Sequence, residues 1–294
     1  MLGRSVLGVL ARRNEYQGAV RVFVRRARIL PAWWKGGVVE GDLLDATAVD
    51  RAVEGCDHIL HLAGVSYADS ERSYRTVNVE GTRTLVEAAR RHGARRFAFS
   101  SSRAIDPAGG GYCASKRDAE RVIRETISDF TIVRLGELYA EGEGRGIADL
   151  IAWIRCHRWV PVIGTGDYSL APLHVEDAAE VMIQALRNCG SGQTCTVTGP
   201  ESMTYNELID LVARALHVQC RKLYLPTWFA RAGAWGAAQC YSGRVAYDQV
   251  ERLVTPRLAM DADTPRLFGL TFRRFSEELP KLVSGKCSAD RGKK

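Results

Sequence analysis

The fold is decided by the stretch His58-Ile59-Leu60-His61-Leu62-Ala63-Gly64. This short apolar run ends in glycine, and such a run is typical of a strand buried on both faces of a sheet. Residues 77–91 then show the spacing of an amphipathic helix, and residues 95–100 form the next apolar strand. Strands and helices alternate in this way over residues 1–135. The alternation predicts an α/β fold with a doubly wound parallel sheet.

Further elements are expected on both sides of this unit. Helices are expected at residues 2–14, 48–53, 112–125, 146–158, 178–187 and 204–216, and strands at residues 20–24, 38–42, 130–135 and 194–199. Thr204 should cap the last helix, because Glu207 three residues later completes a capping box. Beyond residue 140 the pattern is mixed. It predicts a smaller C-terminal lobe over the carboxyl ends of the strands, where ligands of open α/β sheets bind.

The composition is that of an ordinary globular chain. The sequence has 294 residues, 46% of them hydrophobic and 26% charged, which fits one large α/β domain or a main domain with a smaller lobe. Its net charge of +7 is dispersed along the chain without a recognisable nucleic-acid module, so we expect no nucleic-acid partner. A basic protein still favours anionic ligands such as nucleotides.

The chain is expected to be cytoplasmic. It has no run of roughly 18 apolar residues that would predict a transmembrane helix, and residues 1–7 lack the features of a signal peptide. None of the eight cysteines forms a Cys-x-x-Cys pair, so we expect neither a metal site nor a disulfide framework. Reduced thiols in a cytoplasm are the simplest interpretation.

The residues with the clearest chemistry are a serine cluster, a tyrosine and a lysine. Ser100-Ser101-Ser102 closes an apolar run, and Tyr112 precedes Lys116 by four positions at the start of a helical pattern. One helical turn places the phenol and the ammonium on the same face, where the positive charge favours loss of the phenol proton. Such a set can move a proton on and off a carbonyl or an alcohol. The alternative is an ordinary helix with a tyrosine and a solvated lysine.

Five motifs in a fixed order resemble those of the extended short-chain dehydrogenase/reductase family, which includes the NAD-dependent epimerases and dehydratases. In chain order they are Gly41-Asp42-Leu43-Leu44-Asp45, His61-Leu62-Ala63-Gly64, Asn78-Val79-Glu80-Gly81-Thr82, the set Ser101-Ser102 with Tyr112 and Lys116, and His174-Val175-Glu176-Asp177. The resemblance implies a Rossmann-like sheet. It assigns residues 1–140 to dinucleotide binding, residues 141–283 to the rest of the sheet and a substrate lobe, and residues 284–294 to a disordered basic tail.

The resemblance also implies the catalytic roles. Tyr112 becomes the general acid/base, exchanging a proton with the substrate oxygen while the nicotinamide exchanges a hydride with carbon. Lys116 lowers the pKa of Tyr112 and hydrogen-bonds the nicotinamide ribose. Ser102 orients and polarises the substrate carbonyl, and Ser101 takes this role if the alignment slips by one residue. His174 is expected to be structural, and Asp177 to cap a helix.

A second group of residues is implied in cofactor binding: Gly3, Arg25, Arg26, Asp42, Leu43, Leu62, Ala63, Gly64 and Asn78, together with Tyr112 and Lys116. Asp42 would accept a hydrogen bond from the adenine amino group, or simply form a turn. Asn78 ties backbone together near the cofactor, or begins its helix. Arg25 and Arg26 follow the second strand of the family pattern. Guanidinium groups there suit a 2′-phosphate, so NADP is favoured over NAD, the alternative being a solvated arginine pair.

The sequence departs from the family pattern in two places. The family begins with a strand and three glycines, whereas Met1-Leu2-Gly3 matches only the last glycine. That first strand is central in the family's sheet, so we expect its absence to leave a groove between two neighbouring strands, unpaired backbone groups and weak cofactor binding, as in a truncated or mis-started gene product. In addition, the loop at residues 103–111 is short, and Arg134-Leu135 stands where the family often has Arg-Pro. These two changes bear on the substrate more than on the fold.

The predicted function is an NAD(P)-dependent oxidoreductase or epimerase acting on a secondary alcohol or ketone, with a nucleotide-sugar as the first choice of substrate. The alternatives are a hydroxysteroid- or flavonol-type reductase for a bulky apolar substrate and a non-catalytic nucleotide-binding or scaffold protein. Residues 226–236 are apolar and aromatic. They are expected to pack inside the C-terminal lobe, with a substrate lid or a membrane-surface helix as alternatives. The resemblance also implies a homodimer.

Overall fold

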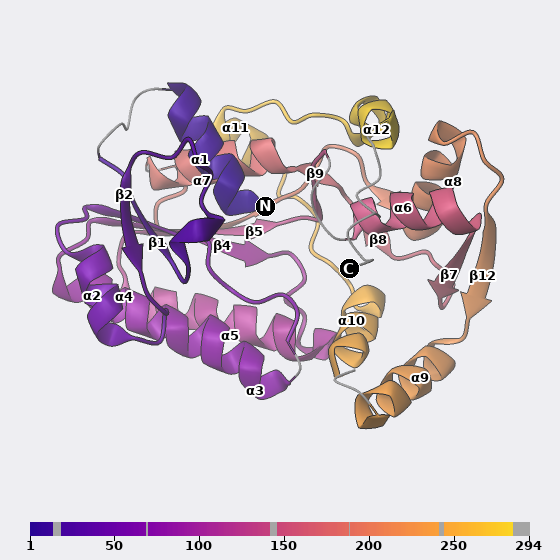
Figure 1. Cartoon of the computed structure of the whole chain (residues 1–294), viewed down its shortest axis with the longest axis horizontal. Helices are drawn as coiled ribbons and strands as arrows, with labels where there is room; N and C mark the ends of the chain where they lie inside the picture. The colour runs from indigo at the N-terminus through magenta and orange to yellow at the C-terminus, as the bar shows by residue number, and fades with distance from the viewer. Residues whose placement is uncertain (14–18, 69, 142–145, 188, 241–243, 285–294) are drawn as a thin grey trace.

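The central sheet has four parallel strands in the order β10-β5-β4-β3 (Figure 1). The computed structural model describes residues 1–13, 19–68, 70–141, 146–187, 189–240 and 244–284, so the basic tail expected at residues 284–294 lies, beyond Ser284, outside the described residues. The strands of the sheet are β3 (His58–His61), β4 (Arg96–Ser102), β5 (Phe130–Leu135) and β10 (Gln193–Val197). The predicted α/β fold with a parallel sheet is confirmed.

Helices cover both faces of this sheet, as the prediction of a doubly wound sheet required. Figure 1 shows α1 and α7 above the sheet, and α2, α4 and α5 below it. Their bounds are α1 (Leu2–Arg13), α2 (Ala46–Val53), α4 (Gly81–Arg91), α5 (Gly110–Thr126) and α7 (Val175–Leu186). Side chains alternate along β4, so Phe97 and Phe99 pack with α4 and α5, while Ala98 packs with α7. Each face of the sheet thereby buries its own apolar core.

The strands β1 (Arg21–Val24) and β2 (Gly37–Glu40) form a separate parallel pair. Within the described residues, β1 has no hydrogen-bond ladder to β3, although Phe23 of β1 packs against the same core cluster as Ile59 of β3. This gap between β1 and β3 corresponds to the groove expected between two neighbouring strands. The facing edges of β1 and β3 therefore lack the cross-strand partners that a continuous sheet would supply.

The helix expected at residues 77–91 begins earlier. It starts as α3 (Glu71–Tyr74), where the Ser70 side chain accepts from the Ser73 amide, passes through a π-helical turn, η2 (Arg75–Glu80), and continues as α4. Asn78 therefore lies inside the helix, and the interpretation that it begins the helix is wrong. A π turn inside a helix shifts the register of its side chains and is frequent at functional sites.

The C-terminal lobe has its own core, built around a parallel pair of strands. Its main elements are α6 (Ile147–His157), β7 (Trp159–Ile163), α8 (Tyr205–Ala215), β12 (Arg221–Leu225), α9 (Thr227–Cys240), α10 (Arg244–Val254) and α12 (Phe275–Ser284). The shorter elements are η1 (Ala27–Ile29), η3 (Pro107–Gly109), β6 (Leu138–Tyr139), β8 (Ser169–Leu170), β9 (Leu173–His174), β11 (Met203–Thr204) and α11 (Thr264–Phe268). No described helix combines the length and the apolarity needed to cross a bilayer.

Two predictions about helix starts have different outcomes. The capping box of α8 is confirmed, since the Thr204 hydroxyl accepts from the Glu207 amide at 3.1 Å and the Glu207 carboxylate accepts from the Thr204 amide at 2.7 Å. Asp177 does not cap α7, because it lies in the first turn of the helix and its carboxylate accepts from the Arg273 amide at 2.8 Å. The cap is His174, whose Nδ1 accepts from the Glu176 amide at 3.3 Å.

The expectation that residues 226–236 pack inside the lobe is wrong for the first turn of α9. Trp228 and Phe229 are exposed there. An apolar run of this length had favoured burial, but the start of α9 lies at the surface of the lobe, and α9 makes its helix–helix contact with α10.

Candidate active site

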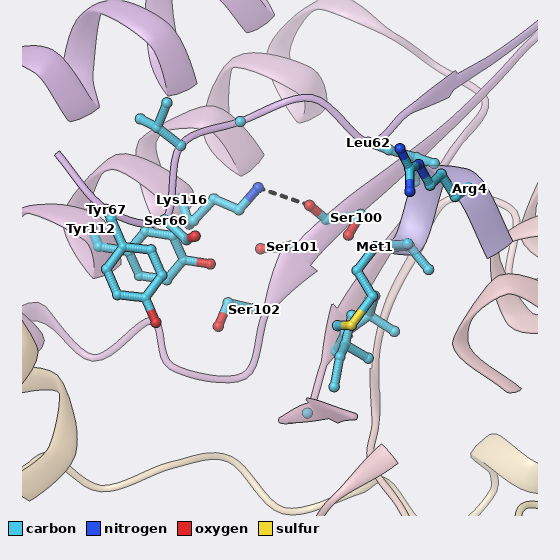
Figure 2. Close-up of a pocket in the computed structure, with 16 residues that line it drawn as sticks. Met1, Arg4, Leu62, Ser66, Tyr67, Ser100, Ser101, Ser102, Tyr112 and Lys116 are labelled. Atoms are coloured by element: carbon cyan, nitrogen blue, oxygen red, sulfur yellow. Dashed lines mark hydrogen bonds between the residues drawn. The ribbon is translucent and has the colours of Figure 1, made fainter. Parts of the chain in front are cut away.

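A cavity of about 740 Å³ lies at the carboxyl ends of β3, β4 and β5 (Figure 2). Its walls come from the ends of these strands, from the first turns of α5 and from the N-terminal residues of the chain. The residues that line it are Met1, Leu2, Arg4, Leu62, Gly64, Val65, Ser66, Tyr67, Ser100, Ser101, Ser102, Tyr112, Lys116, Leu135, Gly136 and Leu138. Parallel strands end at one edge of their sheet, so side chains that are distant in sequence meet there.

Lys116 is held in one position by the end of β4. Its Nζ donates a hydrogen bond to the Ser100 carbonyl oxygen at 2.8 Å and lies 4.4 Å from the centroid of the Phe99 ring. Burial lowers the pKa of Lys116 to about 8, although the charge of Glu120 acts in the opposite direction. The ammonium group is therefore buried with few partners and remains protonated at neutral pH.

Tyr112 is half-buried, and its hydroxyl points into the cavity toward the serine cluster (Figure 2). Burial raises the pKa of Tyr112, while the charge of Arg252 and a hydrogen bond with Ser102 act to lower it. Arg252 is thus the group that lowers the pKa of Tyr112 most, a role that was expected of Lys116. The contact between Tyr112 and Ser102 brings together the two groups that were predicted to face a substrate oxygen.

The two neighbouring serines have different partners. The Ser101 hydroxyl donates to the Glu120 carboxylate at 2.6 Å, and Glu120 is buried and also accepts from Arg134 and Arg124. Burial alone would raise the pKa of Glu120, but the hydrogen bonds from Arg134 and Ser101 hold it below its usual range. Ser101 is therefore engaged beneath the cavity. The Ser102 hydroxyl, which accepts from the Ala104 amide at 3.1 Å, is the one beside Tyr112.

Two residues of α10 lie against Tyr112, and neither was predicted from the sequence. The guanidinium carbon of Arg252 lies 4.8 Å from the ring centroid of Tyr112 and 5.4 Å from that of Tyr67. Asp248 accepts from the Tyr112 amide and from the Tyr74 hydroxyl, both at 3.1 Å. The spacing of four residues puts Asp248 and Arg252 on one helix face, but no sequence pattern links that face to Tyr112.

Asn78 ties the loop after β3 to α5. Its side chain accepts from the Val65 amide at 2.8 Å and donates to the Val65 carbonyl at 3.0 Å and to the Ser115 hydroxyl at 2.9 Å. Gly64 precedes this loop, and a Cβ there would lie 3.1 Å from Asn78 Oδ1 and 3.7 Å from Lys116 Nζ. The glycine therefore keeps open the space beside the lysine, which is the space that a nicotinamide ribose on Lys116 would need. Of the two interpretations of Asn78, the backbone tie is the one observed.

The remaining residues expected at the cofactor do not line this cavity. Leu43 is buried in the core, where it fills the space above Gly81, and Gly3 lies in the first turn of α1, between cavity residues. Asp42 forms a turn, since its carboxylate accepts from the Leu44 amide at 3.0 Å. Arg25 and Arg26 are exposed just after β1. Ala63 lies between two lining residues in the chain but does not itself line the cavity. The catalytic candidates therefore line the cavity together with Leu62 and Gly64, whereas the candidates for adenine binding lie on neighbouring segments outside its lining.

His61 is a buried residue that faces away from this chemistry. Its Nε2 lies 2.9 Å from the Thr82 hydroxyl, and its ring stacks on Phe99 with centroids 5.1 Å apart. Burial and, after it, the charge of Lys116 lower the pKa of His61 to about 3. The imidazole is therefore neutral and structural at neutral pH.

Comparison with known proteins agrees with this arrangement. Residues 1–198 match the model of the NAD dependent epimerase/dehydratase family. A ceramide reductase of Caulobacter vibrioides (strain NA1000 / CB15N) is 32% identical over 230 residues, which cover 76% of this chain and 70% of that enzyme. An N-acetyl-alpha-D-glucosaminyl-diphospho-ditrans,octacis-undecaprenol 4-epimerase of Escherichia coli O157:H7 is 26% identical over 209 residues, covering 63% of this chain and 62% of that enzyme.

The fold is also that of solved relatives. The structure of MoeE5 in complex with UDP-glucose and NAD superposes with a TM-score of 0.75 at 19% sequence identity, over 96% of this chain and 94% of that one. At this identity the likeness concerns the fold alone. The family match over residues 1–198 shows that the chain belongs to the NAD-dependent epimerase/dehydratase family.

Proposed function

We propose that this chain is an NAD(P)-dependent oxidoreductase that interconverts a secondary alcohol and a ketone on a lipid-like substrate. The observation that carries the reaction is the meeting of Tyr112, Ser102 and Lys116 at one cavity. Family membership supplies the cofactor class. A bound nicotinamide supplies or accepts the hydride, and the chain itself supplies the proton.

Each of the three residues has a separate task. Tyr112 gives its phenolic proton to the carbonyl oxygen during reduction and takes it back during oxidation. Ser102 hydrogen-bonds the same oxygen and holds it beside the tyrosine. Lys116 donates to the Ser100 carbonyl at 2.8 Å, and its remaining N–H groups, beside Gly64, would hold the ribose of the cofactor. The residues present therefore fit a nicotinamide nucleotide at this end of the sheet.

NADP is proposed over NAD because of Arg25 and Arg26. Both side chains are exposed at the carboxyl end of β1, the position from which guanidinium groups can meet a 2′-phosphate. Asp42 is proposed to face the adenine, although its carboxylate also forms a turn. A comparison of NADPH and NADH binding tests these assignments. Arg25→Ser/Arg26→Ser should weaken the binding of NADPH and leave that of NADH unchanged.

The substrate class is argued from the relatives and from the lining of the cavity. Both relatives described above have names that specify lipid or lipid-linked substrates, ceramide in one and an undecaprenyl diphosphate sugar in the other. In this chain apolar residues form much of the wall, among them Leu62, Leu135 and Leu138. We therefore place a lipid-like ketone ahead of the nucleotide-sugar that the motifs had favoured.

A nucleotide-sugar remains the second candidate because of charge at the rim of the site. Arg252 lies over the Tyr112 ring, and Arg257, three residues after the end of α10, forms an ion pair with the Glu137 carboxylate at 3.3 Å. Such groups can meet a diphosphate.

Incubation with NADPH and either the 3-keto form of a ceramide or a UDP-4-ketosugar separates the two. Product analysis by mass spectrometry should show that only the ceramide ketone is reduced. Tyr112→Phe should form no reduced product. Reduction of the sugar alone would favour the second candidate. Binding of NADPH with turnover of neither would favour a non-catalytic protein.

A further inference from the structure

The outer face of the β7–β12 pair is apolar and exposed to solvent within the described part of the lobe. Side chains alternate along β7, so Val160 and Val162 point into the core of the lobe, while Trp159 and Pro161 point outward. Leu223 of β12 is in register with Pro161 and is exposed too. A parallel strand pair, which is usually covered on both faces, thus presents an apolar surface to solvent.

The two helices that adjoin this strand pair along the chain also expose aromatic residues. Trp153 of α6 packs edge-on against Trp159 with ring centroids 5.2 Å apart, and Trp228 and Phe229 open α9 three residues after the end of β12. We call these five residues the lobe patch: Trp153 (38% exposed), Trp159 (36%), Leu223 (49%), Trp228 (70%) and Phe229 (53%). Three tryptophans this exposed on one lobe mark an interaction surface rather than scattered surface residues.

Positive charge borders the lobe patch. Arg158 precedes Trp159, and Arg221 is in register with it across the strand pair. Both arginines are exposed, and neither forms an ion pair with a described residue. The neighbouring Lys222 already pairs with Asp210 at 2.8 Å. The border of the patch therefore has unmatched cations beside exposed aromatic rings.

We infer that the lobe patch docks on a membrane surface that contains anionic lipids. Tryptophan rings prefer the interface between headgroups and acyl chains, and arginines beside them attract anionic headgroups. The unmatched charge of Arg158 and Arg221 is what favours this occupant over a second copy of the chain. A second copy would bring the same positive border against itself.

The lobe patch is also joined to the rim of the active site. Arg231 of α9 forms two hydrogen bonds with Glu251 of α10, at 2.7 and 2.8 Å, and Glu251 precedes the Arg252 that lies over Tyr112. Docking would thus hold the α9–α10 pair, and the mouth of the cavity with it, next to lipid. This last step rests on the proposed function, whereas membrane binding itself does not.

Co-sedimentation with vesicles tests the inference. The full-length protein is mixed with vesicles of phosphatidylcholine, with or without the anionic lipid phosphatidylglycerol. We expect sedimentation with the anionic vesicles, weaker binding at high salt, and a partition coefficient at least about tenfold lower in Trp228→Ser/Phe229→Ser. Arg158→Gln/Arg221→Gln should also lose about tenfold or more. Trp33→Ser and Arg28→Gln/Arg90→Gln, which change exposed residues elsewhere, are the matched controls and should bind as the parent does.

Three outcomes would overturn the inference. They are no binding to either vesicle, equal loss in the controls and the patch variants, or a dimer in analytical ultracentrifugation that Trp228→Ser/Phe229→Ser dissociates while vesicle binding is absent. The circular-dichroism spectrum of each variant shows that it is folded. Vesicle binding needs no substrate or cofactor, so its failure would leave the proposed oxidoreductase activity standing, and the reverse also holds.

Discussion

Arg252 influences the protonation of Tyr112, the proposed proton donor. Burial raises the pKa of Tyr112 and would keep the phenol protonated, which suits reduction and hinders oxidation. The guanidinium 4.8 Å from the ring offsets part of this effect. Arg252 therefore acts on the proposed reaction through Tyr112, as a positioning and electrostatic residue.

Arg252→Gln should slow alcohol oxidation more than ketone reduction. Removing the charge raises the pKa of Tyr112, so the basic form needed for oxidation becomes rarer, by about tenfold for each pKa unit. The pH–rate profile for oxidation should move to higher pH, and Arg252→Lys should restore part of the shift. An unchanged profile in Arg252→Gln, with a fall in rate at every pH, would reduce Arg252 to a packing role.

The buried charge of Lys116 lowers the free energy of unfolding, although Lys116 belongs to the candidate site. Its pKa is about 8 in the folded chain against an ordinary 10.5, so below pH 8 the folded state carries a buried charge that the unfolded state solvates freely. The difference corresponds to about 3 kcal/mol against folding at pH 7. Lys116→Met should thus raise the free energy of unfolding by about 1–3 kcal/mol while abolishing turnover.

Urea unfolding at several pH values measures this effect. The gain in Lys116→Met should shrink as pH rises from 8 toward 10.5, because the lysine of the parent protein then loses its proton in both states. A variant that is less stable than the parent at pH 7 would show that the hydrogen bond to the Ser100 carbonyl outweighs the burial of the charge.

The sequence could supply the residues of the site that belong to local patterns. Tyr112 and Lys116 are one helical turn apart, and Ser102 ends a strand next to them. Arg252 and Asp248 could not be found in this way, because they reach Tyr112 from more than 130 residues away through the packing of α10 on α5. Spacing along the chain carries no information on such a contact.

At the scale of elements, β3 runs from the apolar core to the side of the cavity where the cofactor is proposed to bind. Its His61 has a pKa of about 3 instead of the usual 6.5, through burial. Between these two values the unfolded chain binds a proton that the folded chain cannot, so stability falls as pH falls below 6.5. The parent protein should lose about 2 kcal/mol more than His61→Gln between pH 7 and pH 5.

Chemical denaturation at these two pH values checks the prediction. A glutamine can keep the hydrogen bond to Thr82, so both proteins should be folded at pH 7. Equal pH dependence in the two would mean that His61 is protonated in the folded state, contrary to its buried position.

The elements also show where sequence patterns reach their limit. The strand expected at residues 130–135 is β5, with the same bounds, because the three successive β-branched residues Thr131 to Val133 favour a strand. The helix of residues 71–91 was missed at its start because a π turn changes the period of the apolar side chains. The first turn of α9 was expected to be buried, since apolarity alone does not say which surface a helix presents.

At the scale of the whole molecule, the gap between β1 and β3 separates the adenine-side candidates from the catalytic ones. Arg25 and Arg26 follow one edge of the gap, and Leu62 follows the other. No ladder across the described residues fixes the distance between the two edges. A bound dinucleotide would have to contact the residues at both edges of the gap. Its affinity should therefore depend on how rigidly β1 and β3 are held relative to each other.

An added strand should therefore improve both stability and cofactor affinity. Fusing to Met1 a segment of about five apolar residues followed by a glycine-rich turn should raise the melting temperature by several degrees, about 5 °C or more. It should tighten NADPH binding at least tenfold, on the order of 1.4 kcal/mol. The matched control is the same segment with a proline at its centre, which cannot complete the ladder.

Titration of NADPH by fluorescence and thermal melting measures the two effects. If the apolar segment and its proline control behave alike, the edges of β1 and β3 do not accept a strand. The NADP preference and the homodimer implied by the family resemblance stay predictions at this scale.

The central claim is tested most directly by hydride transfer from deuterated NADPH. The protein is incubated with [4-²H]NADPH of each stereochemistry and the 3-keto form of a ceramide, and the alcohol formed is examined by mass spectrometry. We predict one deuterium at the carbinol carbon from one of the two cofactors, and none with Tyr112→Phe, which should still bind NADPH. Product without deuterium, or undiminished product from Tyr112→Phe, would contradict the assignment of Tyr112 as the proton donor of a nicotinamide-dependent reduction.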